Sequence, residues 1–294
     1  MIKANRVCSF VVAAIGIMMI SCASAPKAPE VKPPQVRSGY AEVNGLKMYY
    51  EIHGDKGGVP LVLLHGGGSS IDVTWAHLIP YLITNRTVIA IDEQAHGRSG
   101  DRSGPVSFEQ TADDVAALLK SLGIQKVDVM GFSNGATNAL QVTLRHPQLV
   151  RKLVHISSFT KRSGAAPGFF DYMKTATFAD MPQSLKDAYL KINPDQAALR
   201  NMHDKDAARM RSFKDIPDAK VREIKSATLI VQGDRDVSTP EHAVALSKLI
   251  KDSRLMIVPG GHGDFLGETS MAQPVAKTHE YTAGFINEFL AAPF

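Results

Sequence analysis

The chain has 294 residues, of which 44% are hydrophobic and 21% are charged, and its formal net charge is +4. This length is enough for one large domain, or for one domain with an insertion. Because the charge is mild and no dense Lys/Arg run is interleaved with aromatic residues, we expect no nucleic-acid partner.

The first 21 residues have the pattern of a secretory signal peptide. Lys3 and Arg6 precede an apolar run, Phe10 to Ile20, followed by small residues. That run is too short to cross a bilayer, which requires about 20 apolar residues. A buried core helix is a poor alternative, since a proline-rich stretch follows at once.

The segment Met19 to Cys22 resembles the cleavage site of a bacterial lipoprotein, with Cys22 as the lipid-bearing residue. An ordinary cleavage site at 23–25 would be followed by Pro26, which disfavours cutting. We therefore predict a lipid anchor in the cell envelope, facing the periplasm or the exterior. A soluble periplasmic or secreted protein is the alternative. Cys8 would leave with the signal, so no disulfide is expected.

Residues 22–39 are rich in proline and are predicted to form an extended tether, and residues 40–294 an α/β domain. In this domain, two β-like runs flank Asn44-Gly45, a hairpin signal. Continuous apolar runs then predict a parallel sheet that is buried on both faces. These runs lie at 59–68, 86–100, 126–135, 150–158, 227–236 and 254–263.

Helical periodicity occurs between the predicted strands, at 107–123, 134–147, 240–250 and 278–292. Ser107 and Gln110 stand in the positions of a capping box. The interval 160–222 differs, because it is polar and has no strand-like run. It is predicted to be an inserted helical lid.

The segment VMGFSNGATN contains Ser133 between two glycines, after an apolar strand and before a helix. This strand–turn–helix context is typical of a nucleophile elbow. A serine hydroxyl is a weak nucleophile, so it needs a base and an acid that orients the base. His262, in a glycine-rich loop after a late strand, is the candidate base. Asp236 is the preferred acid and Asp234 the alternative, with a turn-capping role for Asp234.

The segment HGGG, residues 65–68, follows the first parallel strand and is the candidate oxyanion loop. The backbone N–H groups of Gly67 and Asn134 are the predicted donors to a tetrahedral oxyanion. We expect His65 to be structural. Asp92 and Ser99 are expected to brace the loop that they flank. No cofactor or metal is predicted, since His96 has no nearby ligand set and the common phosphate and zinc motifs are absent from the sequence.

Five segments together resemble the α/β-hydrolase superfamily over roughly residues 40–292. They are HGGG (65–68), DEQAHGRS (92–99), GFSNG (131–135), GDRD (233–236) and GGHG (260–263). The resemblance implies an α/β-hydrolase fold with an eight-stranded, mostly parallel sheet flanked by helices. It also implies a lid between the sixth strand and the next helix. The short loops and single lid resemble those of small esterases, enol-lactonases and cofactor-free haloperoxidase-like enzymes.

These residues predict a serine hydrolase that cleaves a small-molecule carboxylic ester or lactone through an acyl-enzyme on Ser133. The same triad serves C–C bond hydrolysis, thioester hydrolysis and perhydrolysis, which stay open. A non-catalytic, ligand-binding lipoprotein is the alternative of a different class. Six lid residues are expected to pack the lid more often than to line an acyl pocket: Met173, Phe178, Met181, Tyr189, Met202 and Met210. Trp75 suits either role.

The lipoprotein hypothesis predicts that the full-length protein incorporates palmitate when expressed in a bacterial host. Cys22→Ala should abolish the label, because the thiol that carries the lipid is removed, while Cys8→Ala should retain it. Labelling that survives in Cys22→Ala would exclude an anchor at this position.

Overall fold

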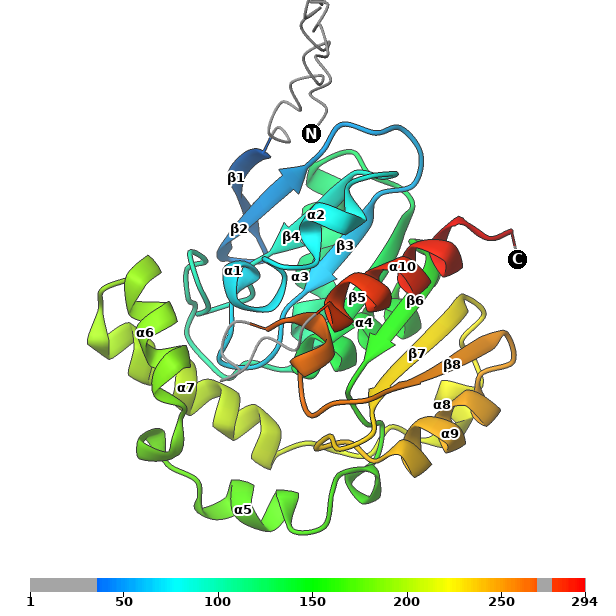
Figure 1. Ribbon diagram of the computed structural model, residues 1–294. Helices are drawn as coiled ribbons and strands as arrows, with labels where there is room; N and C mark the ends of the chain where they lie inside the picture. The colour runs from blue at the N-terminus through cyan, green and yellow to red at the C-terminus, as the bar shows by residue number, and fades with distance from the viewer. Residues whose placement is uncertain (1–35, 269–276, 294) are drawn as a thin grey trace, which may run out of the picture. The chain divides into compact units, whose positions relative to one another are not determined.

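The computed structural model describes residues 36–268 and 277–293. The predicted signal peptide, Cys22 and the tether up to residue 35 lie outside the described residues and stay predictions. Within the described part, helices lie on both sides of a central sheet (Figure 1).

The sheet has eight strands in the order β1-β2-β4-β3-β5-β6-β7-β8. The pairs β1–β2 and β2–β4 are antiparallel, and all later pairs are parallel. This confirms the predicted mostly parallel sheet. The strands are β1 (Val36–Val43), β2 (Leu46–His53), β3 (Leu61–Leu64), β4 (Val88–Ile91), β5 (Val127–Phe132), β6 (Val150–Ile156), β7 (Ala227–Gly233) and β8 (Ser253–Val258).

Continuous burial explains the continuous apolar runs of the central strands. Every residue of β3, β4, β5 and β7 is buried, because helices cover both faces of the sheet. One face packs against α3 (Phe108–Ser121), α4 (Asn134–Arg145) and α9 (Pro240–Leu249). The other packs against α1 (Ile71–Thr74), α2 (Ile79–Leu82) and α10 (Thr278–Ala291).

The predicted tether extends too far at its C-terminal end. Residues 36–39 belong to β1 and pair with Tyr50 to His53 of β2. The sequence pattern does not predict the start of this strand, because its first residues are exposed and show no alternation of apolar and polar residues. The hairpin turn at Asn44-Gly45 is as predicted, with both residues at positive φ.

The capping box predicted at Ser107 forms only in part. The Ser107 hydroxyl accepts the backbone N–H of Gln110, as expected. The Gln110 amide instead donates to Asp114 Oδ1, 3.1 Å away, so it does not return to the helix start. A charged partner in the next turn competes successfully with the backbone of Ser107.

The lid lies between β6 and the short helix α8 (Asp218–Val221), which agrees with the predicted insertion (Figure 1). It contains α5 (Phe169–Thr175), α6 (Gln183–Ile192) and α7 (Gln196–Arg211), with short 3-10 turns η1 (Arg162–Gly164) and η2 (Phe178–Asp180). The predicted limit at residue 222 reaches too far, since Val221 packs in the main core. A third 3-10 turn, η3 (Asp264–Leu266), follows β8.

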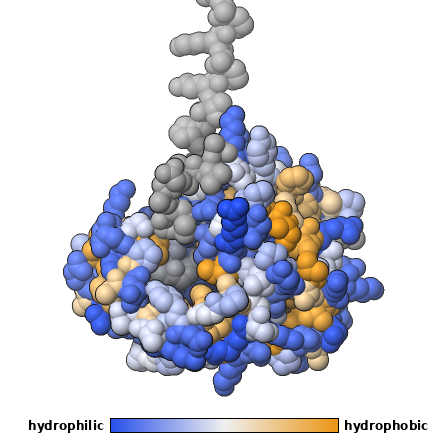
Figure 2. Space-filling view, turned by 60° about the horizontal axis from the view of Figure 1, so that its bottom comes forward, coloured by the Kyte–Doolittle hydropathy of each residue, from blue (hydrophilic) through white to orange (hydrophobic). Residues whose placement is uncertain are grey.

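Hydrophilic residues cover much of the face shown in Figure 2, with apolar patches between them. The exposed large apolar side chains include Tyr172, Tyr281 and Phe285. Across the described ranges, no helix is both long enough and apolar enough to pass through a bilayer.

Candidate active site

Ser133 lies at a sharp turn between β5 and α4, with φ 55° and ψ −121°. A serine rarely adopts positive φ, so this conformation costs about 1–3 kcal/mol and requires support from its surroundings. The flanking glycines allow that support. A Cβ on Gly131 would lie 2.0 Å from the Gly135 carbonyl oxygen, and one on Gly135 would lie 2.1 Å from the Leu64 oxygen. The predicted elbow is therefore present, and its glycines are required by close backbone approach.

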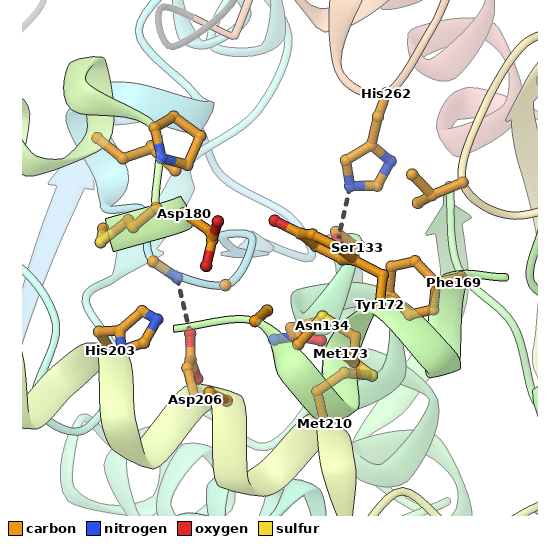
Figure 3. A pocket seen from close by; sticks show the side chains of 18 of the residues that line it. Ser133, Asn134, Phe169, Tyr172, Met173, Asp180, His203, Asp206, Met210 and His262 are labelled. Atoms are coloured by element: carbon orange, nitrogen blue, oxygen red, sulfur yellow. Dashed lines mark hydrogen bonds between the residues drawn. The ribbon is translucent and has the colours of Figure 1, made fainter. Parts of the chain in front are cut away.

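The structure brings Ser133, His262 and Asp236 into one hydrogen-bonded chain. His262 Nε2 lies 2.9 Å from Ser133 Oγ (Figure 3). On its other side, His262 Nδ1 lies 2.6 Å from Asp236 Oδ1. Since a carboxylate only accepts, Nδ1 carries the proton, and Nε2 is free to accept the serine proton. Ser157 Oγ and the Val237 N–H also donate to Asp236, at 2.5 and 2.6 Å, and fix the carboxylate.

These contacts change the proton affinities of the pair. Burial acts to lower the pKa of His262, but the hydrogen bond and the charge of Asp236 outweigh it and raise that pKa. Burial acts to raise the pKa of Asp236, but its hydrogen bonds and the charge of His262 lower it. The aspartate thus stays ionised at neutral pH and stabilises the imidazolium.

Asp234 does not reach the histidine. Its Oδ1 accepts the N–H of Gly260, at 2.8 Å, and so joins the turn after β7 to the loop after β8. The structure thus assigns Asp236 to the histidine and Asp234 to the turn, which was the preferred assignment from the sequence.

Gly67 and Asn134 line the same pocket as Ser133. Asn134 is the first residue of α4, where backbone N–H groups have no partner inside the helix. In the loop itself, the N–H of Gly68 donates to Asp206 Oδ2 at 2.7 Å, so this amide is already engaged. The N–H of Gly67 is therefore the better candidate donor from this loop.

Two predicted structural roles are confirmed. His65 is fully buried, with Nδ1 2.8 Å from the Gly66 oxygen and Nε2 accepting the N–H of Glu93. Asp92 accepts the N–H groups of Ile71 and Arg98, both at 2.9 Å. Ser99 Oγ donates to the Asp92 carbonyl and accepts the N–H of Tyr49. These bonds stabilise the loops beside Ser133.

The pocket above Ser133 has a volume of about 290 Å³. Of the six lid residues considered from the sequence, Met173, Met181 and Met210 line it, although Met181 also packs within the lid. The other three, Phe178, Tyr189 and Met202, pack within the lid. Trp75 is fully buried in the core between the sheet and helices α1, α2 and α10, and it does not line the pocket. Its role is therefore packing.

Three residues at the site were not predicted from the sequence: Ser157, Asp180 and Asp206. Asp180 and Asp206 face the pocket from the side opposite Ser133 and His262 (Figure 3). Both come from the polar lid sequence, where aspartates are expected to be solvated, and no sequence signal distinguished them.

Over the described residues, no cluster of three or more His, Cys, Asp or Glu residues is arranged to hold a metal ion.

Comparison with known proteins finds a family model that matches part of the chain. Residues 59–191 match the model of the "alpha/beta hydrolase fold" family. The human serine hydrolase BPHL is 28% identical over 240 residues, which cover 77% of this chain and 80% of that protein.

Two other relatives match over shorter regions. RutD of Azorhizobium caulinodans, which is named as a candidate carbamate hydrolase, is 30% identical over 155 residues. The dihydrolipoyllysine-residue acetyltransferase component of an acetoin cleaving system of Pseudomonas putida is 31% identical over 196 residues. The two matches include 53% and 66% of this chain. They span only 56% and 51% of the length of the two relatives, so the chain matches little more than half of each.

Solved structures share the fold over nearly the whole described chain. An enol-lactonase of Burkholderia xenovorans LB400 matches with a TM-score of 0.66 and 20% identity, covering 86% of this chain and all of that one. Est816, described as an N-acyl homoserine lactone degrading enzyme, matches with a TM-score of 0.63 and 25% identity, covering 86% of this chain and 98% of that one. The predicted fold class is confirmed.

The contact between His262 and Asp236 predicts a change in proton affinity that needs no substrate. Asp236→Asn should lower the pKa of His262, because the main cause of its elevation is removed. The neutral imidazole would then persist to lower pH than in the wild type. NMR titration of the histidine ring signals measures this.

Asp234→Asn is the matched control, since it makes the same change two residues away. It should leave the titration of His262 unaltered. An equal effect of both variants would contradict the pairing of His262 with Asp236.

Proposed function

We propose that the chain is a serine hydrolase of the α/β-hydrolase superfamily and that it cleaves a carboxylic ester or lactone. The observation that carries the proposal is the chain of hydrogen bonds from Ser133 through His262 to Asp236, at 2.9 and 2.6 Å. Nucleophile, base and orienting acid stand in the order that acyl transfer requires.

In the first half of the proposed reaction, Ser133 Oγ attacks the carbonyl carbon and passes its proton to His262 Nε2. The backbone N–H groups of Gly67 and Asn134 stabilise the oxyanion that forms. Collapse of the tetrahedral intermediate breaks the acyl–oxygen bond, and the imidazolium returns the proton to the leaving alcohol. An ester of Ser133 remains.

In the second half, His262 removes a proton from water, and the hydroxide attacks the acyl carbon. The second intermediate collapses, Ser133 recovers its proton, and the carboxylic acid leaves. For a lactone, the alcohol and the acid belong to one molecule. The similarity to Est816, described as an N-acyl homoserine lactone degrading enzyme, supports including lactones as substrates.

The acyl group is proposed to be apolar and uncharged. Apolar lid side chains dominate the pocket, and its volume is at the small end for ligand sites. Among the described residues that line it, there is no Lys or Arg, whereas Asp180 and Asp206 contribute carboxylates. Asp206 is paired with Arg209, which leaves Asp180 as the carboxylate without a buried cation beside it. Hydrogen bonds from Thr177 lower the pKa of Asp180, so it is ionised at neutral pH. A negatively charged acyl group would be repelled there and would lose its hydration.

The proposed nucleophile gives a direct test. Ser133→Ala should reduce kcat for p-nitrophenyl butyrate by about 10⁴- to 10⁶-fold and abolish labelling by a fluorophosphonate. Ser247→Ala, a change on the exposed end of α9, should keep both activities. Hydrolysis that persists in Ser133→Ala, with labelling elsewhere, would refute the mechanism. A folded wild type without labelling or hydrolysis would favour a binding role.

The proposed acyl preference is tested with two alkyl esters of equal length. Methyl hexanoate should be cleaved with a kcat/KM at least about tenfold above that of monomethyl adipate, whose acyl group ends in a carboxylate. Acid release in a pH-stat measures both. The difference in kcat/KM between the two esters should narrow at high salt, since exposed charges are screened. It should also narrow in Asp180→Asn, since the repelling carboxylate is removed.

Asp187→Asn is the matched control, because Asp187 lies on α6 and does not line the pocket. This variant should keep the wild-type preference. A wild-type enzyme that prefers the adipate would contradict the proposed acyl class but not the serine mechanism.

A further inference from the structure

Four charged side chains form a buried cluster between the lid and the loops beside Ser133. Glu93 and His96 follow β4, and Asp206 and Arg209 lie on lid helix α7. Their exposed fractions are 1%, 1%, 8% and 3% in that order. Arg209 bridges the two carboxylates, 2.5 Å from Asp206 Oδ1 and 3.3 Å from Glu93 Oε2. Charges are buried to this extent only when they are paired.

Acceptors face both ring nitrogens of His96 and favour a doubly protonated ring, and the N–H of Gly68 makes a longer contact of 3.3 Å with Nε2. Nδ1 lies 2.8 Å from the carbonyl oxygen of Gln94, which can only accept. Nε2 lies 3.0 Å from Asp206 Oδ2, also an acceptor when ionised. Burial acts to lower the pKa of His96, but the charge and hydrogen bond of Asp206 outweigh it and raise that pKa. Two cations therefore balance two anions in the cluster.

Asp206 connects this cluster to the oxyanion loop. Its Oδ2 accepts the N–H of Gly68 at 2.7 Å, from 138 residues further along the chain. The same oxygen would lie 3.0 Å from a Cβ built on Gly67, so the carboxylate is close to the loop at both glycines. Figure 3 shows Asp206 rising from α7 to this bond at the edge of the pocket.

We propose that Asp206 is a positioning residue for the oxyanion hole. It holds the Gly68 amide, and through it the adjoining Gly67 amide, in the orientation that receives the developing oxyanion. The lid helix then has a second role besides enclosing the acyl group, since the hole is complete only with α7 seated on the loop. This inference rests on the proposed serine hydrolase function.

The variant Asp206→Asn removes the anion with little change in shape. It is expected to fold, because His96 can then lose a proton and the Arg209–Glu93 pair remains, so the cluster stays neutral. The Gly68 amide loses its charge-assisted acceptor. We expect kcat for p-nitrophenyl butyrate to fall about tenfold with KM changed less than about twofold, because the transition state loses more than the bound substrate.

Asp206→Ala removes the carboxylate and leaves the Gly68 N–H only its longer contact with His96 Nε2, at 3.3 Å. It should lower kcat by up to about 10²-fold, approaching the loss of one oxyanion-hole donor. Asp204→Asn is the control. It makes the same change two residues earlier on α7, where Asp204 is exposed and paired with Arg200 and His203. It should leave kcat, KM and the thermal midpoint near their wild-type values.

Hydrogen–deuterium exchange of peptides covering residues 65–70 provides a readout without turnover. Both Asp206 variants should exchange faster in this segment than the wild type and Asp204→Asn. Unchanged exchange, or a kcat for Asp206→Asn equal to that of Asp204→Asn, would overturn the proposal. If Asp206→Ala does not fold, Asp206→Asn decides.

The two hypotheses fail in different ways. If the wild type shows no Ser133-dependent hydrolysis, the proposed function is wrong, and the oxyanion role of Asp206 is overturned with it, even where exchange shows that Asp206 holds the loop. If hydrolysis depends on Ser133 but kcat is insensitive to Asp206, only the positioning role is wrong.

Discussion

The strained backbone at Ser133 is the constraint on which the arrangement of the site depends. Its positive φ persists because α4 packs so closely on β3 that the Leu64 carbonyl occupies the space of a Cβ on Gly135. Leu64 is also the last residue of β3, immediately before the oxyanion loop. One close contact therefore fixes the nucleophile turn and the start of the loop that faces it. This shared contact explains why the loop residue Gly67 and the helix residue Asn134 border one pocket although they are far apart in the sequence.

Charge compensation is the second requirement of this site. A carboxylate beside a forming oxyanion would oppose it, and Asp206 lies next to the loop that is proposed to bind the oxyanion. Burial acts to raise the pKa of Asp206, but Arg209 and His96 lower it and offset its charge. The carboxylate can thus act as a hydrogen-bond acceptor without leaving a net negative field. Asp236 meets the same requirement differently, through His262 and two further donors.

The sequence predicted the parts of the site that follow strands. Continuous apolar runs identified the parallel strands, and carboxyl ends of parallel strands lie at one edge of a sheet, so Ser133, Asp236 and His262 were expected to meet. The cluster beneath the lid was not predictable in this way. Asp206 and Arg209, three residues apart on a polar helix, have the spacing of an ordinary exposed ion pair. Only the packing of α7 on the oxyanion loop buries them, and that packing depends on residues distant in the sequence. The early start of β1 was missed for a related reason, since an exposed edge strand needs no apolar alternation.

Substrate fit and catalytic geometry are not separate properties in this molecule, because helix α7 contributes to both. Met210 lines the acyl pocket, and one turn earlier Asp206 holds the oxyanion loop. An acyl group that displaced α7 would therefore disturb the donors that its own transition state needs. Discrimination between acyl groups would then appear in kcat as well as in KM, since a poorly fitting substrate weakens the hole in addition to binding less well. The buried ion pairs of α7 limit this displacement, because separating them would leave charges unpaired in a site of low polarity.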